Sequence, residues 1–111
     1  MKLEAGQFVR TKDGEIHKIK SINDEYIEYE NGFGIPYELK EYIVKASYSI
    51  IDILEVGDYV NGRKVIDKWE EPDWYGYFIK LDGEETTPTI RHIKSVITHE
   101  QMEQMAYKVV E

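Results

Sequence analysis

The sequence predicts a mainly β protein made of two small tandem units, and three observations lead to that prediction. Residues 3–9 (Leu-Glu-Ala-Gly-Gln-Phe-Val) return as residues 54–60 (Leu-Glu-Val-Gly-Asp-Tyr-Val), with four of seven positions identical. Short apolar segments are separated by dipeptides such as Asn31-Gly32 and Asp82-Gly83, which favour tight hairpin turns. The nine tyrosines and many β-branched residues suit half-buried strands. A repeat of about 50 residues with four or five short strands favours two SH3-like small β-barrels.

The first half is expected to hold four short strands and one helical turn. Asp13-Gly14 is typical of a hairpin turn, and the isoleucines that follow it favour a strand with a bulge. Ile27 and Tyr29 alternate with their polar neighbours, so both should lie on one face of the strand. The strands are predicted at residues 6–10, 15–22, 25–30 and 33–37, and the helical turn at residues 38–42. Pro36 places the fourth strand at a sheet edge, because proline donates no backbone hydrogen bond.

A long run of apolar and β-branched residues from Ile43 to Val60 predicts one continuous strand that joins the two halves. The halves are placed at residues 1–52 and 53–111, as a first SH3-like repeat and a second repeat that carries a C-terminal helix and strand. The alternative architecture is one larger, partly open β-barrel built from both halves.

The second half is expected to follow the same plan, with strands at residues 57–60, 64–69, 75–81 and 93–97. Strand alternation decides how the halves correspond, because a slip of one residue moves every side chain to the other face. On that ground Ile79 should correspond to Ile27, and Leu81 to Tyr29. An acidic loop at residues 70–74 has no counterpart in the first half.

The C-terminal tail is predicted to form a short helix and a terminal strand. Thr98 and Gln101 have the spacing of a capping box, which predicts a helix from His99 to about Ala106. Residues 107–110 are expected to form the strand. Such a tail would close a sheet edge or pair with a second copy of the chain, which makes it a candidate surface for a homo-oligomer.

Three segments carry a resemblance to known proteins: residues 1–10, 49–62 and 93–101. They are similar to the start, a central segment and the C-terminal ending of small uncharacterised proteins encoded by phages and prophages of Gram-positive bacteria. The resemblance implies a phage or prophage origin and a bacterial cytoplasmic setting, or a place in the virion for a structural protein. It brings no activity and no catalytic residues to this chain.

The chain has a net charge of −8, spread over both halves. Nucleic-acid binding and attachment to anionic membranes need a basic surface, and no basic run is present, so neither is expected. A basic protein partner is compatible with this charge. The sequence has no cysteine, no long apolar run and no apolar leader, which predicts a cytoplasmic protein without disulfides.

No catalytic, cofactor-binding or metal-binding residues are predicted, and the chain is expected not to be an enzyme. His17, His92 and His99 lack the short spacing typical of zinc ligands. The sequence also lacks the glycine-rich nucleotide motifs and the nucleophile elbow of hydrolases. The loop carboxylates are neighbours in sequence and are expected to be solvated, not paired across a pocket.

The candidate binding site is one loop of the second half, made of Glu70, Glu71, Asp73, Trp74 and Tyr75. Trp and Tyr supply much of the binding energy at protein interfaces. SH3-like grooves bind proline-rich peptides on such rings, with acidic neighbours that select basic residues. Trp69 is expected instead to fill the core of the second unit, and core packing is also the alternative for Trp74.

Two functions follow from these features. The first is a non-enzymatic protein-binding or assembly module that acts through the Trp74 loop or through an exposed strand edge. The alternative is an acidic mimic of DNA, or a structural accessory protein that acts as a homo-oligomer through its C-terminal tail. A DNA mimic requires carboxylates arranged in rows on one face.

Overall fold

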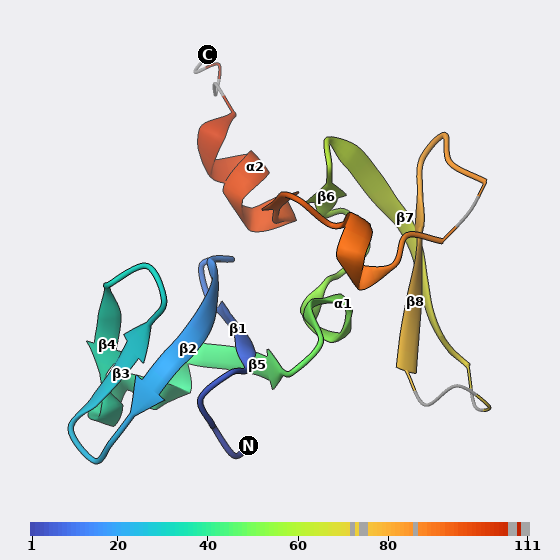
Figure 1. Cartoon of the computed structure of the whole chain (residues 1–111). Helices are drawn as coiled ribbons and strands as arrows, with labels where there is room; N and C mark the ends of the chain where they lie inside the picture. Colours follow the sequence, from blue (N-terminus) through green and yellow to red (C-terminus); the bar gives the residue numbers. More distant parts are fainter. Residues whose placement is uncertain (72, 74–75, 86, 107–108, 110–111) are drawn as a thin grey trace. The chain divides into compact units, whose positions relative to one another are not determined.

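The computed structural model describes residues 1–71, 73, 76–85, 87–106 and 109. The fold is mainly β, as predicted, with two antiparallel sheets and short helices (Figure 1). The chain divides into two compact units, Met1–Ile53 (unit 1) and Leu54–Glu111 (unit 2). Every helix in the described residues is too short or too polar to cross a membrane.

Unit 1 holds a five-stranded antiparallel sheet in the order β4-β3-β2-β1-β5. Its elements are β1 (Phe8–Thr11), β2 (Ile16–Ile22), β3 (Tyr26–Tyr29), β4 (Gly34–Pro36), the 3₁₀ helix η1 (Tyr37–Tyr42), β5 (Ile43–Ser47) and α1 (Ile50–Ile53). β4 lies at the sheet edge, as Pro36 predicts, and η1 confirms the expected helical turn. β5 returns to pair with β1, so the first and last strands of the unit are neighbours.

The core of unit 1 forms on one face of its sheet. It consists of the buried residues Val9, Ile19, Ile27, Tyr29 and Ile43. Ile27 and Tyr29 alternate along β3 with polar or exposed neighbours, as predicted. The pairing of β2 with β3 shifts register between Ile19 and Ser21, which confirms the predicted bulge. The bulge adds one residue to β2 and re-aims the side chains that follow it.

Unit 2 holds a four-stranded antiparallel sheet in the order β8-β7-β6-β9. Its elements are β6 (Tyr59–Val60), β7 (Arg63–Glu71), β8 (Gly76–Leu81), the 3₁₀ helix η2 (Ile90–His92), β9 (Val96–Ile97) and α2 (His99–Met105). The last strand again pairs with the first, since β9 lies beside β6. Within the described part of unit 2, no strand takes the place that β4 has in unit 1.

The burial pattern of β8 follows the predicted alternation. Ile79 and Leu81 are buried, as Ile27 and Tyr29 are in unit 1. Tyr77 belongs to the same alternating set but is 41% exposed. The buried apolar set of unit 2 is completed, among the described residues, by Leu54, Val60 and Val65.

The predicted continuous strand from Ile43 to Val60 is wrong. β5 ends at Ser47, α1 follows, and the chain turns again before β6. The Ser47 hydroxyl accepts a hydrogen bond from the Ser49 amide at 3.1 Å and donates one to Asp52 at 2.6 Å, which favours a helical turn at this point. Ile51 and Ile53 are buried on that turn. A short apolar run is buried equally well in a strand or in a helix, and composition alone does not separate the two.

The predicted acidic loop at residues 70–74 is partly strand. β7 continues to Glu71, and its hairpin with β8 pairs Glu70 with Tyr77 and Glu71 with Gly76. Both glutamates are therefore held by a backbone ladder rather than by a loop. Asp73 lies in the turn that follows.

The C-terminal helix and its capping box are confirmed. The Thr98 hydroxyl accepts from the Gln101 amide at 3.2 Å, and the Gln101 side chain accepts from the Thr98 amide at 3.0 Å. Residues 107, 108 and 110 of the expected final strand lie outside the described residues, so that strand stays a prediction.

The repeated stretch forms the same turn in both units. We call residues 4–7 and 55–58 the entry turns, because each leads into the first strand of its unit. The amide of the first residue donates to the side chain of the fourth, at 2.8 Å in unit 1 and 2.7 Å in unit 2. The third residue is a glycine with a φ of 91° or 102°. Its amide donates to the second strand at 2.8 and 2.9 Å. The first strands were predicted to begin at these glycines, and they begin instead after the turns.

Candidate functional site

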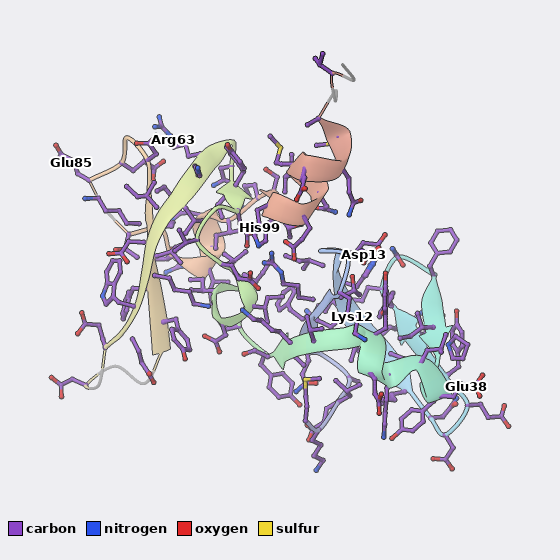
Figure 2. All side chains as sticks on the ribbon, turned by 180° about the vertical axis from the view of Figure 1, so that it is seen from behind. Lys12, Asp13, Glu38, Arg63, Glu85 and His99 are labelled. Carbon is purple, nitrogen blue, oxygen red and sulfur yellow. The ribbon has the colours of Figure 1, made fainter. Side chains whose placement is uncertain are left out.

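Unit 1 contains a pocket of about 210 Å³ that we call the unit 1 pocket. Residues from β1 to the end of η1 line it: Thr11, Glu15, His17, Tyr29, Asn31, Phe33, Gly34, Ile35 and Tyr42. Figure 2 labels Lys12 and Asp13 on the β1–β2 turn, which supplies one side of this lining. The residues are far apart in sequence and meet because β2, β3 and β4 are neighbours in the sheet.

Tyr29 is the most buried aromatic residue of the pocket and is only 4% exposed. Its ring stacks on that of His17, with the centroids 4.2 Å apart and the planes within 2°. The Tyr29 hydroxyl is buried and has no hydrogen-bond partner among the described residues. A buried hydroxyl without a partner costs about 1–3 kcal/mol. Tyr29 lines the pocket, so a shift of the side chains that cover this hydroxyl would let a bound molecule supply the missing partner.

His17 is contacted at both ring nitrogens. Its Nε2 lies 3.3 Å from Oε2 of Glu15, and its Nδ1 lies 3.4 Å from Nδ2 of Asn31. The His17 side chain is 17% exposed and that of Glu15 is 51% exposed. The imidazole is thus covered, while the carboxylate reaches solvent and gives the pocket entrance a negative charge.

Asp13 adds a second carboxylate on the β1–β2 turn. It accepts hydrogen bonds from the hydroxyls of Thr11 and Tyr42. The hydrogen bond from Thr11 lowers the pKa of Asp13, so this carboxylate stays charged well into acid. The bond to Asp13 raises the pKa of Tyr42, and burial is the main reason that the pKa of Tyr29 is raised as well. Both phenols are therefore neutral hydrogen-bonding groups at physiological pH.

Exposed rings continue the pocket surface. Phe33 is 76% exposed and Tyr42 is 36% exposed. The chain between these two rings passes close to β3 at Gly34. A Cβ at this position would lie 2.0 Å from the Ile27 carbonyl oxygen, so only glycine fits there. Aromatic faces beside carboxylates attract cationic groups and accept the apolar parts of an extended peptide. The arrangement is thus suited to binding.

The structure describes three of the five predicted site residues. Glu70 and Asp73 are exposed, and the half-buried Glu71 accepts a hydrogen bond from the Trp69 indole at 2.9 Å. Trp74 and Tyr75 lie outside the described residues. The group Glu70, Glu71, Asp73, Trp74 and Tyr75 therefore stays a predicted binding site.

Trp69 is half-buried and does not fill the core of unit 2 as expected. Its ring lies against Phe78 with the centroids 6.1 Å apart. The indole N–H needs a polar partner, and Glu71 supplies it near the surface. The buried position of β7 belongs to Val65.

Sequence reasoning missed the unit 1 pocket. Its members are turn formers or ordinary strand residues when each is judged by its neighbours in sequence. The one signal was the presence of His17 and Tyr29 on neighbouring strands, and the stacking of their rings becomes predictable only when the register around the β2 bulge is known.

One group of metal-ligating side chains occurs in the described part of the chain. It consists of Glu55, His99 and Glu100, whose ligand atoms lie within 4.8 Å of one another in unit 2. The sequence prediction compared the histidines only with one another and so did not find this group. His92 has a different environment, since its Nδ1 lies 2.8 Å from the Thr89 hydroxyl.

Two arrangements in this protein can therefore hold a ligand: the unit 1 pocket, and the carboxylate and imidazole group of unit 2. The first offers aromatic faces, a buried hydroxyl and negative charge. The second offers ligands for a cation. Comparisons of the chain with protein-family models, with curated proteins and with solved structures found no match.

Proposed function

We propose that the chain is a non-enzymatic protein-binding module whose unit 1 pocket receives a basic side chain from an extended segment of a partner protein. The observation that carries the proposal is the buried hydroxyl of Tyr29, which lacks a partner in the described structure and belongs to a residue that lines a pocket of rings and a carboxylate. A lysine or arginine offers donors to this hydroxyl and positive charge to Glu15 and Asp13. Phe33 and Tyr42 offer exposed aromatic surface to the neighbouring residues of the partner.

We also propose the SH3-like architecture for each unit. The support in unit 1 is the strand order β4-β3-β2-β1-β5, with a 3₁₀ helix before the last strand. The support in unit 2 is the pairing of its first and last strands, again with a 3₁₀ helix before the last. SH3-like domains bind extended proline-rich segments on exposed rings beside acidic residues. The unit 1 pocket has that composition.

The net charge of −8 supports a basic partner. Opposite charges on two proteins speed their association and select against partners of the same charge. The lowered pKa of Asp13 keeps one of the charges next to the pocket in place across the physiological range.

A peptide-binding measurement tests the proposal. The probes are two fluorescent peptides of about ten residues that alternate proline with arginine or, in the matched probe, proline with glutamine. Fluorescence anisotropy should show binding of the arginine peptide alone. Glu15→Gln and Phe33→Ala should each weaken it by about tenfold, the effect of losing about 1.4 kcal/mol of binding energy. Circular dichroism checks that each variant is folded.

Trp74→Ala is the control, because the loop at residues 70–75 is the competing site. We expect this variant to bind as the wild type does. Loss of binding in Trp74→Ala, with full binding in Glu15→Gln, would move the site to the loop. A wild-type chain that binds neither peptide, or both equally, would reject recognition of basic segments.

A second candidate function is the assembly of identical copies through unit 2. β9 is an edge strand, and a pocket of about 390 Å³ lies beside it. The lining is Val96, Ile97, Gln101, Gln104 and Met105. Ile97 is 39% exposed and Met105 is 65% exposed. An edge strand next to an apolar groove can pair with the same edge of a second copy.

Light scattering tests this second candidate. The wild type should have the mass of a dimer at high protein concentration, and Ile97→Lys should return it to the mass of a monomer. Deleting residues 98–111 should also change the mass, but it removes the capping box as well, so the point substitution is the cleaner test. A wild-type monomer at all concentrations would reject assembly through β9.

We propose a bacterial cytoplasmic or virion setting, on the strength of the resemblance of residues 1–10, 49–62 and 93–101 to phage and prophage proteins. The genes beside the coding sequence test this setting. Packaging or structural genes would favour the assembly function, and regulatory genes would favour the binding module. A neighbourhood of ordinary chromosomal genes would contradict the phage origin.

A further inference from the structure

We propose that Glu55, His99 and Glu100 form a binding site for a divalent transition-metal ion, with Zn²⁺ as the fitting example. The site lies in unit 2, between the entry turn at residues 55–58 and the first turn of α2. It uses no residue of the unit 1 pocket, so the inference stands apart from the proposed binding function.

The three side chains converge on one point. Nε2 of His99 lies 3.0 Å from Oε1 of Glu55 and 3.1 Å from Oε1 of Glu100. The side chains are 42%, 32% and 26% exposed for His99, Glu55 and Glu100. They are thus partly covered and still reachable from solvent. A metal ion would lie among these atoms after shifts of the side chains alone.

A fully buried carboxylate fixes the backbone of the site. Oδ2 of Asp58 accepts from the Glu55 amide at 2.7 Å, and Oδ1 accepts from the His99 amide at 2.9 Å. Asp58 is 0% exposed. The one side chain therefore ties together two segments that are far apart in sequence. A site held at its backbone loses little entropy when the ion binds.

Unit 1 shows how the same frame looks without metal ligands. Its entry turn carries Glu4, which accepts a hydrogen bond from the hydroxyl of Tyr48. A Cβ on Gly6 would lie 3.5 Å from the Tyr48 ring, and a Cβ on Gly57 would lie 3.5 Å from the His99 Cβ and 3.9 Å from its ring carbon Cγ. The aromatic ring after the last strand is a phenol in unit 1 and an imidazole in unit 2. Only unit 2 combines the imidazole with a second glutamate, Glu100.

The chemistry of the residues decides the class of ion. A neutral imidazole nitrogen with two carboxylate oxygens is a ligand set of Zn²⁺ and of other first-row divalent ions. Mg²⁺ and Ca²⁺ prefer oxygen ligands only. A proton on Nε2 of His99 makes one linear hydrogen bond. Two carboxylate oxygens, however, lie within hydrogen-bond distance of that nitrogen.

Isothermal titration calorimetry with Zn²⁺ on the full chain tests the site. We expect one ion per wild-type chain and at least about a tenfold weaker affinity in Glu55→Gln and Glu100→Gln, since even outer-shell changes weaken metal sites by 10- to 100-fold. His99→Tyr should abolish the binding while the protein stays folded, because Tyr48 shows that this frame accepts a phenol. Co²⁺ should give visible absorption bands in the wild type that His99→Tyr lacks.

His92→Gln and Glu4→Gln are the matched controls, and both should bind Zn²⁺ as the wild type does. Three results would overturn the site: no stoichiometric Zn²⁺ binding by the wild type, equal binding by His99→Tyr, or Ca²⁺ binding tighter than Zn²⁺. A rise in the melting temperature with Zn²⁺ in the wild type, and none in His99→Tyr, is the independent readout.

Discussion

The backbone conformation of Gly57 favours glycine. Its φ of 102° lies where side chains are strained, although a Cβ there would meet the His99 Cβ at an ordinary contact distance of 3.5 Å. Gly57→Val should therefore cost at least about 1–2 kcal/mol of unfolding free energy. Val56→Ala should change it by less than about 0.5 kcal/mol, because Val56 is 55% exposed. Urea denaturation of both variants measures the difference. Equal costs would show that the entry turn tolerates a side chain.

Tyr29 should show a trade between stability and binding. Tyr29→Phe removes a buried hydroxyl that has no partner in the described structure, so the folded chain should be as stable as the wild type or more stable by about 1 kcal/mol. The same change should weaken binding of the arginine peptide. Tyr48→Phe is the control, because the Tyr48 hydroxyl already bonds to Glu4. A marked loss of stability in Tyr29→Phe would show that the hydroxyl has an internal partner.

Asp13 predicts a loss of stability in acid. Its pKa is lowered from the ordinary 3.8, chiefly by the hydrogen bond from Thr11. A lowered folded-state pKa gives stability that is complete above 3.8 and is lost as the pH falls through the lower folded value. The stability advantage of wild type over Asp13→Asn should thus be constant down to about pH 5 and shrink below about pH 4. Urea unfolding across that range measures it. An advantage that is independent of pH would contradict the charge effect.

Individual residues were predictable where one rule decided their position. Alternation in single strands correctly grouped Ile27 with Tyr29 and Ile79 with Leu81, and all four are buried. The same rule could not show that Tyr29 also faces a pocket, because that depends on what the neighbouring strands and turns bring to it. Trp69 was placed in the core because it takes the position of Ile19 in the repeat, but its indole nitrogen needs a polar partner and finds it at Glu71.

At the scale of elements, Asp58 connects the entry turn of unit 2 to α2. Asp58→Ala removes both acceptors at once and should cost about 3 kcal/mol, with faster hydrogen exchange at the His99 amide. Asp58→Asn keeps one acceptor and should cost less. Asp24→Ala, at an exposed turn, should cost almost nothing. The prediction would fail if Asp58→Ala unfolded at the same urea concentration as Asp24→Ala.

The elements show what the sequence could and could not predict. Turn dipeptides and the capping box have local chemistry, so the β3–β4 hairpin and the start of α2 were predicted correctly. The strand expected across Ile43 to Val60 failed, because hydrogen bonds around Ser47 favour a helical turn inside an apolar run. The end of β7 depends on its partner strand, so the position of Glu71 could not be read from its acidic neighbours.

At the scale of the whole molecule, the mainly β class with short helices was predictable from turn spacing and residue composition. The two candidate binding sites were not. Each brings together side chains from separate segments, and the sequence alone does not give those distances. The carboxylates of Glu55 and Glu100 lie on opposite ends of unit 2 in sequence and meet at His99 only in the folded chain.

The net charge of the molecule predicts a salt-dependent interaction. Raising the NaCl concentration from about 50 to 500 mM should weaken binding of the arginine peptide several-fold, because salt screens charges beyond a few ångströms. The change should be smaller in the Asp13→Asn and Glu15→Gln double variant, which lacks the charges next to the pocket. Anisotropy titrations at both salt concentrations measure this. Binding that is independent of salt would indicate an apolar interaction instead.

Unit 2 follows unit 1 without a spacer, since Ile53 ends the first compact unit and Leu54 begins the second. The entry turn of unit 2 therefore starts only one residue into that unit. Residues 3–53 also start with Leu-Glu and end with Ile53, so an in-frame duplication of those codons would recreate the same Ile-Leu-Glu junction on both sides. The gene is therefore extendable by recombination without inventing a linker. A longer chain of three or more units, each with its own candidate binding surface, can therefore be made by repeating residues 3–53 in frame.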